Sequence, residues 1–351
     1  MATSETRPRA HSFGGVTHGR VAIAAASIAS AVAGSLVPLQ ADINAELVAA
    51  LDNPVASAAV STILSGVLLS FASVRSCGAL KLDGLKPWHL SGGVFGAVYV
   101  LALVVLTEPL GPATLFVAAE AGSMAVAAIL DHVGFAGAAT RRLTQRRAAG
   151  VLLPVLGCVV LEAPAVSAAA GASGAKRLRL AALSFAAGGC KPLQASLNRR
   201  LKMVMGSTEV AAVTSCAVGG CALVAMLMLD VTIRKATPAP DWVPIPDEWP
   251  AWWQWSGGLL GIVGVVVPVL ASEVFGMAVY FVCNLFGQLS AAVALQFVSG
   301  REAVTQGLVA RMCGAVVLGL LGGLLVQDLQ LGACASAPDC MRRKGGARIL
   351  V

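Results

Sequence analysis

The sequence predicts an all-α integral membrane protein with ten transmembrane helices, arranged as two five-helix repeats of inverted topology. Of its 351 residues, 57% are hydrophobic and only 12% are charged, whereas soluble domains carry about 25% charged residues. The mean hydropathy is +0.80. Several long apolar stretches can cross a bilayer, and blocks of sequence recur in the same order in both halves. This composition argues against a soluble enzyme and against a disordered protein.

The expected spans follow from the need for about 20 mainly apolar residues per crossing. The first five form a repeat at 21–166 and the second five a repeat at 180–328, with a connecting loop at 167–179. In chain order the predicted spans are 21–40, 55–74, 89–106, 111–131, 148–166, 180–198, 208–228, 255–272, 275–297 and 312–328.

The connections between spans differ greatly in length. The turns at Glu108 to Gly111 and at Ser272 to Val274 are so short that the spans they join must form antiparallel hairpins. The longest polar interruption, 229–254, is rich in Pro and Trp, and its four prolines within 238–250 forbid a regular helix. We therefore expect a loop there.

The distribution of positive charge predicts that both termini are cytoplasmic. With the N-terminus inside, the cytoplasmic segments hold 17 Lys and Arg and the outer segments hold 7, and cytoplasmic loops are the ones enriched in these residues. The N-terminal tail 1–20 and the basic C-terminal tail 329–351 both lie on the inner side in this arrangement. All six tryptophans precede the third or the eighth span, as an interfacial aromatic belt requires. A plasma membrane is favoured over an organellar one.

Three blocks of sequence occur twice. Their recurrence in the same order indicates that the two halves are repeats of each other. Because each repeat holds five spans, an odd number, the second repeat enters the membrane with the opposite orientation. Inverted repeats of this kind are typical of transporters that work by alternating access. The blocks are PLQADINAEL at 38–47 and PLQASLNRRL at 192–201, PWHLSGGVFG at 87–96 and WQWSGGLLG at 253–261, and EPLGPA at 108–113 and EVFGMA at 273–278.

Two ionisable residues lie well inside predicted spans, where charge is costly and function is the default reading. Glu120 is near the middle of the fourth span; desolvation favours its neutral form, which makes it a candidate proton carrier, and burial for packing is the alternative. Lys191, in the sixth span, could attract an anionic ligand, pair with Glu120 or extend toward the cytoplasmic interface. The repeat equivalent of Glu120 is Leu285, beside Asn284, so the carboxylate is not symmetric.

Two pairs of amide side chains follow the proline of the recurring PLQ block. The members of each pair are four residues apart and therefore share one helical face. Polar pairs at equivalent places in both halves indicate a cavity at the interface between the repeats, and interhelical amide bonds that hold the bundle together are the alternative. The pairs are Gln40 with Asn44 and Gln194 with Asn198.

Two further groups of residues are assigned structural roles. Asp131 and His132 end the fourth span beside a basic loop, where surface salt bridges are expected. Six glycines at recurring positions indicate close packing of helix backbones more than contact with a substrate; they are Gly92, Gly93, Gly96, Gly257, Gly258 and Gly261.

Nothing in the sequence indicates an enzyme. The four histidines form no zinc-binding pattern, no phosphate-binding lysine loop or nucleophile elbow is present, and the nine cysteines lack metal-ligand spacing. We therefore predict no catalytic residue, no metal and no cofactor. Nor does any basic cluster with interleaved aromatic residues suggest nucleic acid as a partner.

The function predicted from these observations is secondary transport of a small organic metabolite or drug-like solute by alternating access. The expected partners are the lipid bilayer, a small-molecule substrate and, through Glu120, protons as a coupling ion; a homodimer is left open. A non-transporting polytopic membrane protein with a structural or regulatory role is the alternative, because composition does not separate the two.

The first half carries the segments LDNPVASAAVS at 51–61, EPLGPATL at 108–115 and AEAGSMAVAAILDHVGFAG at 119–137, in addition to the blocks above. With these motifs the chain resembles the YdcZ-type branch of the drug/metabolite transporter (DMT) superfamily, with its EamA-like fold. The second half looks like a diverged copy that keeps the PLQ block and the pair Gly287–Gln288. Members of that branch often look like a single five-span unit, so the resemblance implies two fused units and a secondary carrier.

In one respect the first half departs from the family pattern, because Ser123 stands where a glutamine is usual after Gly122. The two halves are therefore not expected to contribute equally to a site. The complete set of candidate cavity residues is Gln40, Asn44, Glu120, Lys191, Gln194, Asn198, Asn284 and Gln288.

Overall fold

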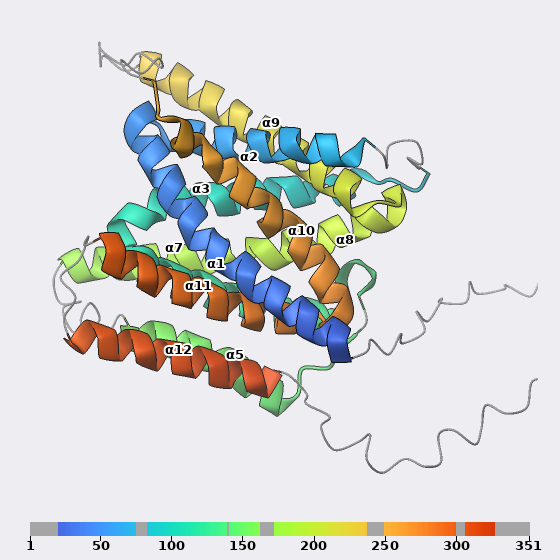
Figure 1. The fold of residues 1–351 in the computed structure, drawn as a ribbon, viewed down its shortest axis with the longest axis vertical. Helices are drawn as coiled ribbons and strands as arrows, with labels where there is room; N and C mark the ends of the chain where they lie inside the picture. The colour runs from blue at the N-terminus through green and yellow to red at the C-terminus, as the bar shows by residue number, and fades with distance from the viewer. Residues whose placement is uncertain are drawn as a thin grey trace, which may run out of the picture.

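The computed structural model describes residues 20–74, 83–138, 140–161, 172–236, 249–299 and 306–326, and all regular structure within them is helical (Figure 1). The predicted tails, apart from Arg20, and residues 237–248 of the predicted loop lie outside these ranges. The helices of the first half are α1 (Arg20–Leu51), α2 (Pro54–Ser73), η2 (Pro87–Ser91), α3 (Gly92–Leu110), α4 (Pro112–Val133), η3 (Phe135–Gly137) and α5 (Gln145–Leu161). Those of the second half are α7 (Ala172–Gly188), α8 (Cys190–Met205), α9 (Thr208–Ala236), η4 (Trp252–Ser256), α10 (Gly257–Phe275), α11 (Met277–Ser299) and α12 (Gln306–Val326).

The length and composition of the helices agree with a multi-pass membrane protein. In the described part of the chain, seven helical stretches are long and apolar enough to cross a bilayer. The predicted sixth span instead comprises two shorter helices, α7 and α8, which meet at Gly189. The all-helical membrane class is thus confirmed, and the number of ten spans stays a prediction. The seven stretches lie in α1, α2, η2 with α3, α4, α9, η4 with α10, and α11.

The same succession of elements occurs in both halves. Helix α1 corresponds to α7 with α8, and α2 to α9, while η2, α3, α4 and α5 correspond to η4, α10, α11 and α12. The predicted hairpins are present, because a single residue, Gly111 or Gly276, separates α3 from α4 and α10 from α11. These two glycines have φ values of 73° and 91°, in a backbone region that residues with a Cβ atom rarely adopt.

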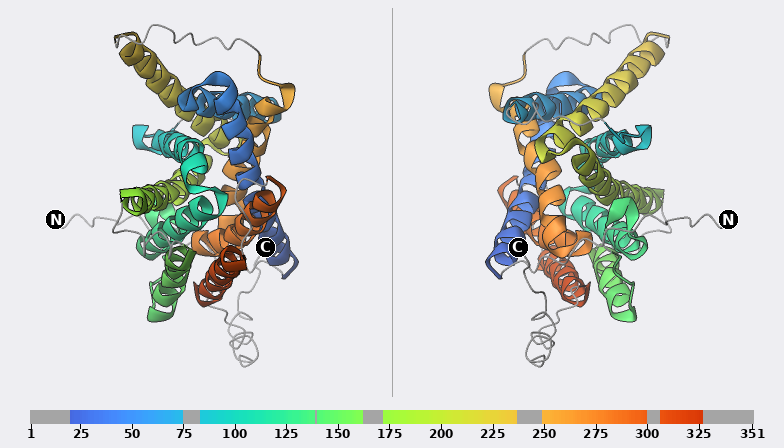
Figure 2. Two further views of the ribbon diagram at one scale, coloured as in Figure 1. Left: turned by 90° about the vertical axis from the view of Figure 1, so that its left-hand side faces the viewer. Right: turned by 90° about the vertical axis from the view of Figure 1, so that its right-hand side faces the viewer.

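Helices of one half pack against helices of the other in a reciprocal way (Figures 1 and 2). Helix α1 contacts α10 and α11, whereas α7 and α8 contact α3 and α4; α2 packs on α9, and α5 on α12. Glycines bring the backbones together at equivalent points: Gly122 of α4 lies against the Phe185 carbonyl of α7, and Gly287 of α11 against the Ala31 carbonyl of α1. A Cβ atom at either glycine would overlap the facing backbone. Small residues that were not among the predicted glycines thus bring the helix backbones of the two halves together at this crossing.

Three predicted boundaries differ from the structure because hydropathy marks apolar stretches and not the ends of helices. Helix α1 continues to Leu51 through Pro38, and residues 229–236 of the predicted loop belong to α9. Residues 172–179 of the predicted connecting loop form the start of α7. Their charge lowers the hydropathy, yet the Arg177 guanidinium packs inward, with Nη2 donating to the Leu110 carbonyl at 3.3 Å.

Large apolar side chains cover the outer faces of the bundle. Phe71 is 72% exposed and Leu152 is 64% exposed. Polar side chains such as Asn284 and Gln288 are instead buried between helices. This inverted distribution is what a lipid environment favours, because only the interior of the bundle offers hydrogen-bond partners.

Candidate functional site

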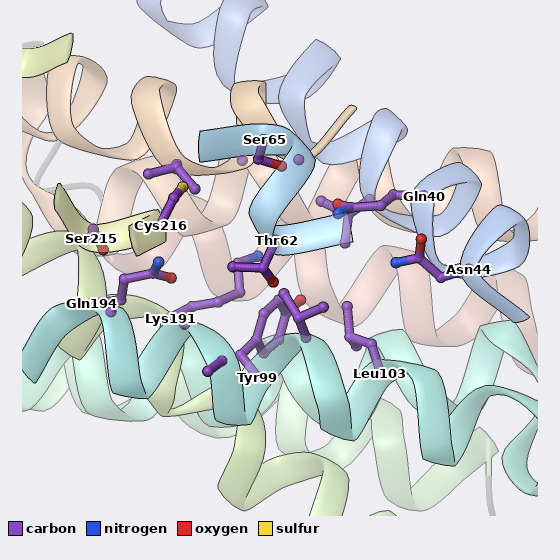
Figure 3. A pocket seen from close by; sticks show the side chains of 18 of the residues that line it. Gln40, Asn44, Thr62, Ser65, Tyr99, Leu103, Lys191, Gln194, Ser215 and Cys216 are labelled. Atoms are coloured by element: carbon purple, nitrogen blue, oxygen red, sulfur yellow. The ribbon is translucent and has the colours of Figure 1, made fainter. Parts of the chain in front are cut away.

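A cavity of about 60 Å³ lies where the two halves cross, lined by α1, α2 and α3 from the first half and α8, α9 and α10 from the second. At about 10–15 Å³ per water, it has room for about four to six waters. Figure 3 shows Lys191, Thr62 and Tyr99 near its middle, with Gln194 toward one end and Asn44 toward the other. A smaller cavity adjoins it and shares Lys191 and Gln194 as lining residues.

The amide pairs and the recurring glycines contact each other across the two repeats. The α8 pair packs on α3, where a Cβ atom at Gly92 would lie 2.7 Å from Asn198 Oδ1. The α1 pair packs on α10, where a Cβ atom at Gly261 would lie 2.9 Å from Gln40 Nε2. The other two amides, Gln194 and Asn44, leave no room for a Cβ atom at Gly96 and Gly257, respectively. The glycines of each half thus make space for the amides of the other.

A buried ion pair lies beside the cavity. Lys191 Nζ of α8 is 2.6 Å from Glu120 Oε1 of α4 and donates to Asn284 Oδ1 of α11 at 2.9 Å. Gln288 Nε2, one turn further along α11, donates to the same Glu120 oxygen at 2.5 Å. The Glu120 side chain is fully enclosed, at 0% exposure, whereas that of Lys191 retains 8%. Three helices therefore hold one carboxylate, one ammonium and two amides in contact.

Aromatic rings surround the ammonium group of Lys191. Its Nζ lies 5.3 Å from the ring centroid of Tyr99 and 5.2 Å from that of Phe281, within the range of a cation–π interaction. The hydroxyl of Tyr280 accepts from Asn284 Nδ2 at 3.1 Å, and Asn284 in turn accepts from Lys191. The rings and amides hold the ammonium group in place at the edge of the cavity.

Several polar atoms that line the larger cavity have no hydrogen-bond partner among the described residues. Three are hydroxyl oxygens, on Thr62, Tyr99 and Ser215, and the fourth is Asn44 Oδ1. Because a buried polar group without a partner costs about 1–3 kcal/mol, such groups call for water or a ligand in the cavity. The cavity is therefore suited to a solute with polar groups.

The chain was compared with known proteins. A family model described as "Putative inner membrane exporter, YdcZ" matches residues 25–160 and 180–326, once in each half. The chain belongs to this YdcZ family. The description is that of a transporter, which is not an enzyme class, and the two matched segments show that the chain fuses two such units.

The other comparisons add the fold alone. A protein of known crystal structure matches this YdcZ-family chain with a TM-score of 0.55 and 18% sequence identity, covering 89% of this chain and 100% of its own. A search of curated protein sequences finds no match.

The structure distributes the eight predicted site residues of this YdcZ-family protein over three adjoining places. Gln40, Asn44, Gln194 and Lys191 line the larger cavity. Asn198 lines the smaller one. The remaining three, Glu120, Asn284 and Gln288, line neither cavity and form the polar cluster behind Lys191. Their part in binding a solute stays a prediction, as does the choice between a cavity and simple packing.

Two interpretations of single residues were wrong. Lys191 does not extend toward the cytoplasmic interface, because the Glu120 carboxylate and the Asn284 amide hold its ammonium group inside the bundle. Asp131 is not at the surface: it pairs with Arg147 at 3.5 Å with both side chains at most 5% exposed, and its Oδ2 accepts from the Ala278 amide of α11 at 3.3 Å. Helix α4 ends against α11, which encloses this pair.

Sequence reasoning missed Tyr99 and Tyr280. A signal was available for Tyr99, which lies within an apolar run and away from the span ends where interfacial aromatic residues belong. Tyr280 lies in the first turn of α11 and gave no such signal. Sequence reasoning also missed the hydroxyls of Thr62 and Ser215, because a single polar residue in an apolar helix does not indicate a binding site. Among the described residues, no group of three or more His, Cys, Asp or Glu could hold a metal ion.

Proposed function

We propose that this YdcZ-family protein is a secondary transporter that moves a small organic solute by alternating access, with the cavity between the repeats as its binding site. The observation that carries this proposal is the cavity at the crossing of the two halves, bordered by the Lys191–Glu120 ion pair. Buried charges in a membrane protein are costly and are rarely kept for packing alone. With room for only about four to six waters, a cavity of this size must widen to load most organic solutes.

Inverted topology is part of the proposal. It is supported by the reciprocal packing of equivalent helices and by the positions of the equivalent residues Gln40 and Gln194 on opposite sides of the cavity (Figure 3). The start of α1 and the end of α12 lie on the same side of the molecule in Figure 1, as an even number of crossings requires. We infer ten spans with both termini in the cytoplasm, with α7 and α8 together forming the sixth.

Labelling of single cysteines tests this topology. In a cysteine-free background, Arg142→Cys and Ala251→Cys place reactive groups at two exposed positions in different predicted loops. A membrane-impermeant maleimide added to intact cells should label position 251 and reach position 142 only after the membrane is opened. Labelling of both positions from the same side would contradict the ten-span arrangement.

Proton coupling is proposed through Glu120. In the conformation described above, the Glu120 carboxylate accepts from Lys191 and Gln288, so the charged form is paired. Movement of α8 during the transport cycle would separate the pair and leave a carboxylate in an apolar setting, where its neutral form is favoured. The carboxyl group would then take up a proton in one conformation and release it in the other. Glu120→Gln retains hydrogen-bonding capacity but cannot carry a proton.

The transport function is tested in two stages. Metabolite profiling of a deletion strain and an overexpressing strain identifies the solutes whose distribution changes, and these are then supplied to proteoliposomes with a pH gradient. Wild-type protein should accumulate the solute against its gradient, whereas Glu120→Gln should support exchange without accumulation. Undiminished pH-driven uptake by Glu120→Gln would exclude this residue as the proton carrier. A folded protein with no flux for any profiled solute would favour the non-transporting alternative.

A further inference from the structure

The charge that faces the cavity is positive. Among the residues that line the larger cavity, Lys191 is the one Lys or Arg and none is an Asp or Glu; Lys191 lines the smaller cavity as well. Its partner Glu120 is fully enclosed and lines neither cavity. A solute in the cavity therefore meets an ammonium group, and the carboxylate lies behind that group and out of reach. This arrangement opposes an organic cation and favours an anion.

The ammonium group has donor capacity for such a ligand. An ammonium group has three donors, and in the described part of the chain the oxygens of Glu120 and Asn284 account for two of them. The hydroxyls of Thr62, Tyr99 and Ser215 line the same cavity from α2, α3 and α9, and each is buried without a partner among the described residues. Hydroxyl groups can donate to an oxyanion. Figure 3 places Thr62 and Tyr99 beside Lys191 near the middle of the cavity, whereas Ser215 lies toward the Gln194 end. The two central hydroxyls and one cation form a site for a single negative group.

The size and lining of the cavity limit the rest of the solute. With room for about four to six waters, the cavity fits a molecule of only a few heavy atoms. Much of its lining is apolar, including Val37, Val100 and Leu103. A single cation is a weak match for a doubly charged phosphate, which proteins bind with several donors and charges. A short hydrocarbon chain ending in one carboxylate satisfies both the apolar and the polar part of the lining.

We propose that the cavity binds a short aliphatic carboxylate whose oxygens accept hydrogen bonds from Lys191 and from the hydroxyls of Thr62 and Tyr99. This inference rests on the proposed transport function and names its substrate class. The Lys191–Glu120 pair then acts as a preformed counter-ion site, in which Glu120 neutralises the lysine while the cavity is empty.

The test measures binding separately from transport. Thermal unfolding of the detergent-solubilised full-length protein is followed at constant ionic strength with butyrate, with butyramide as its neutral analogue and with butylamine as its cationic analogue. Butyrate should raise Tm in a saturable way, on the order of 2–4 °C near tenfold excess over its Kd. Butyramide and butylamine should leave Tm within about 1 °C of the ligand-free value. An equal response to all three, or no response to butyrate, overturns the proposal.

Matched variants assign the response to the cavity. The double variant Lys191→Met/Glu120→Gln removes both charges together, so no unpaired charge is left buried, and it should lose the butyrate response. Lys202→Gln removes a lysine eleven residues further along the chain in α8, one that pairs with Glu273 at the surface, and should keep the full response. A butyrate response retained in the double variant contradicts the site.

The two proposals can fail separately. Saturable butyrate binding that depends on Lys191, without any flux in proteoliposomes, would support the carboxylate site and overturn the transport function. Flux of a neutral or cationic solute, together with no butyrate response, would support transport and overturn the carboxylate site.

Discussion

The two repeats are alike where they pack on each other and different where charge is buried. The amide pair of α1 rests on the glycines of α10, and the amide pair of α8 rests on those of α3. No such equivalence exists for the ion pair, because Val37 stands at the position equivalent to Lys191 and Leu285 at the position equivalent to Glu120. The amide–glycine packing contacts are therefore present in both repeats, whereas the Lys191–Glu120 ion pair is present once.

This difference separates two kinds of residue. Contacts that occur twice are those that any association of two such units needs in order to pack. The Lys191–Glu120 contact occurs once and takes the acid from the first repeat and the base from the second, so neither repeat can form this pair by itself. Equivalent substitutions in the two halves should therefore have equal effects at the packing contacts and unequal effects near the charges.

The largest effect is expected for Lys191→Met. It leaves the Glu120 carboxylate, which is fully enclosed, without a counter-charge, and loss of one partner from a buried pair costs about 3–5 kcal/mol. Glu120→Gln should cost less, because Lys191 borders the cavity and water can reach it. Unfolding of the purified variants in detergent measures both losses.

The double variant Lys191→Met/Glu120→Gln is the control for this prediction. It should recover most of the stability lost in Lys191→Met, because a neutral pair leaves no charge to be solvated. Additive losses in the double variant would mean that the two side chains act independently, and the contrast between charged and packing contacts would then fail.

Much of this scaffold could be predicted from the sequence because its causes are local. The recurring PLQ and SGG blocks reveal the repeat, and apolar length locates most of the helices. The pairing of Lys191 with Glu120 was one of three alternatives, since residues 71 positions apart meet only through tertiary packing. The burial of Asp131 was missed for the same reason, as its enclosure depends on α5 and α11.

Alanine substitutions at Gly122 and Gly287 test the symmetry of the scaffold. Each glycine packs on a backbone carbonyl of the other repeat, and a backbone cannot move aside as a flexible side chain can, so each variant should lose about 1–3 kcal/mol. Gly264→Ala is a matched control, because a Cβ atom there meets nothing within 4 Å. Thermal unfolding should show similar losses at Gly122 and Gly287 and none at Gly264. A loss confined to one half would mean that the packing is not equivalent.

Leucine at Gln40 or Gln194 should have a smaller effect, seen in flux. These amides occupy equivalent positions at the cavity, and a hydrogen bond to a solute or water contributes about 0.5–1.5 kcal/mol, which corresponds to a two- to tenfold change in rate. Uptake per folded molecule in proteoliposomes should fall by this amount in both variants. Should folded yield fall in proportion to uptake, the amides serve packing instead.

The smallest effect is expected at the surface. Lys202 Nζ lies 2.8 Å from Glu273 Oε1, and the two side chains are 24% and 39% exposed. The first repeat has no equivalent pair: Glu108 corresponds to Glu273, but Val48 stands at the position equivalent to Lys202. Exposed pairs of this kind contribute about 0–1 kcal/mol. Lys202→Gln should therefore lower stability by less than about 1 kcal/mol, and added salt should reduce the difference further. A larger loss of stability would mean that this exposed pair contributes as much as the buried contacts do.

The neutrality of the buried pair also bears on electrogenicity. Lys191 and Glu120 together carry no net charge, so the membrane voltage exerts little force on their movement in the empty carrier. A bound monocarboxylate would give the loaded site one negative charge. Moving one charge through the full potential is worth about 2.3 kcal/mol per 100 mV, and a potential that is negative inside would drive that step outward. Under voltage clamp, a loaded carrier with Glu120 ionised would then generate current, whereas proton uptake by Glu120 would cancel the charge of the bound carboxylate and make the loaded step electroneutral.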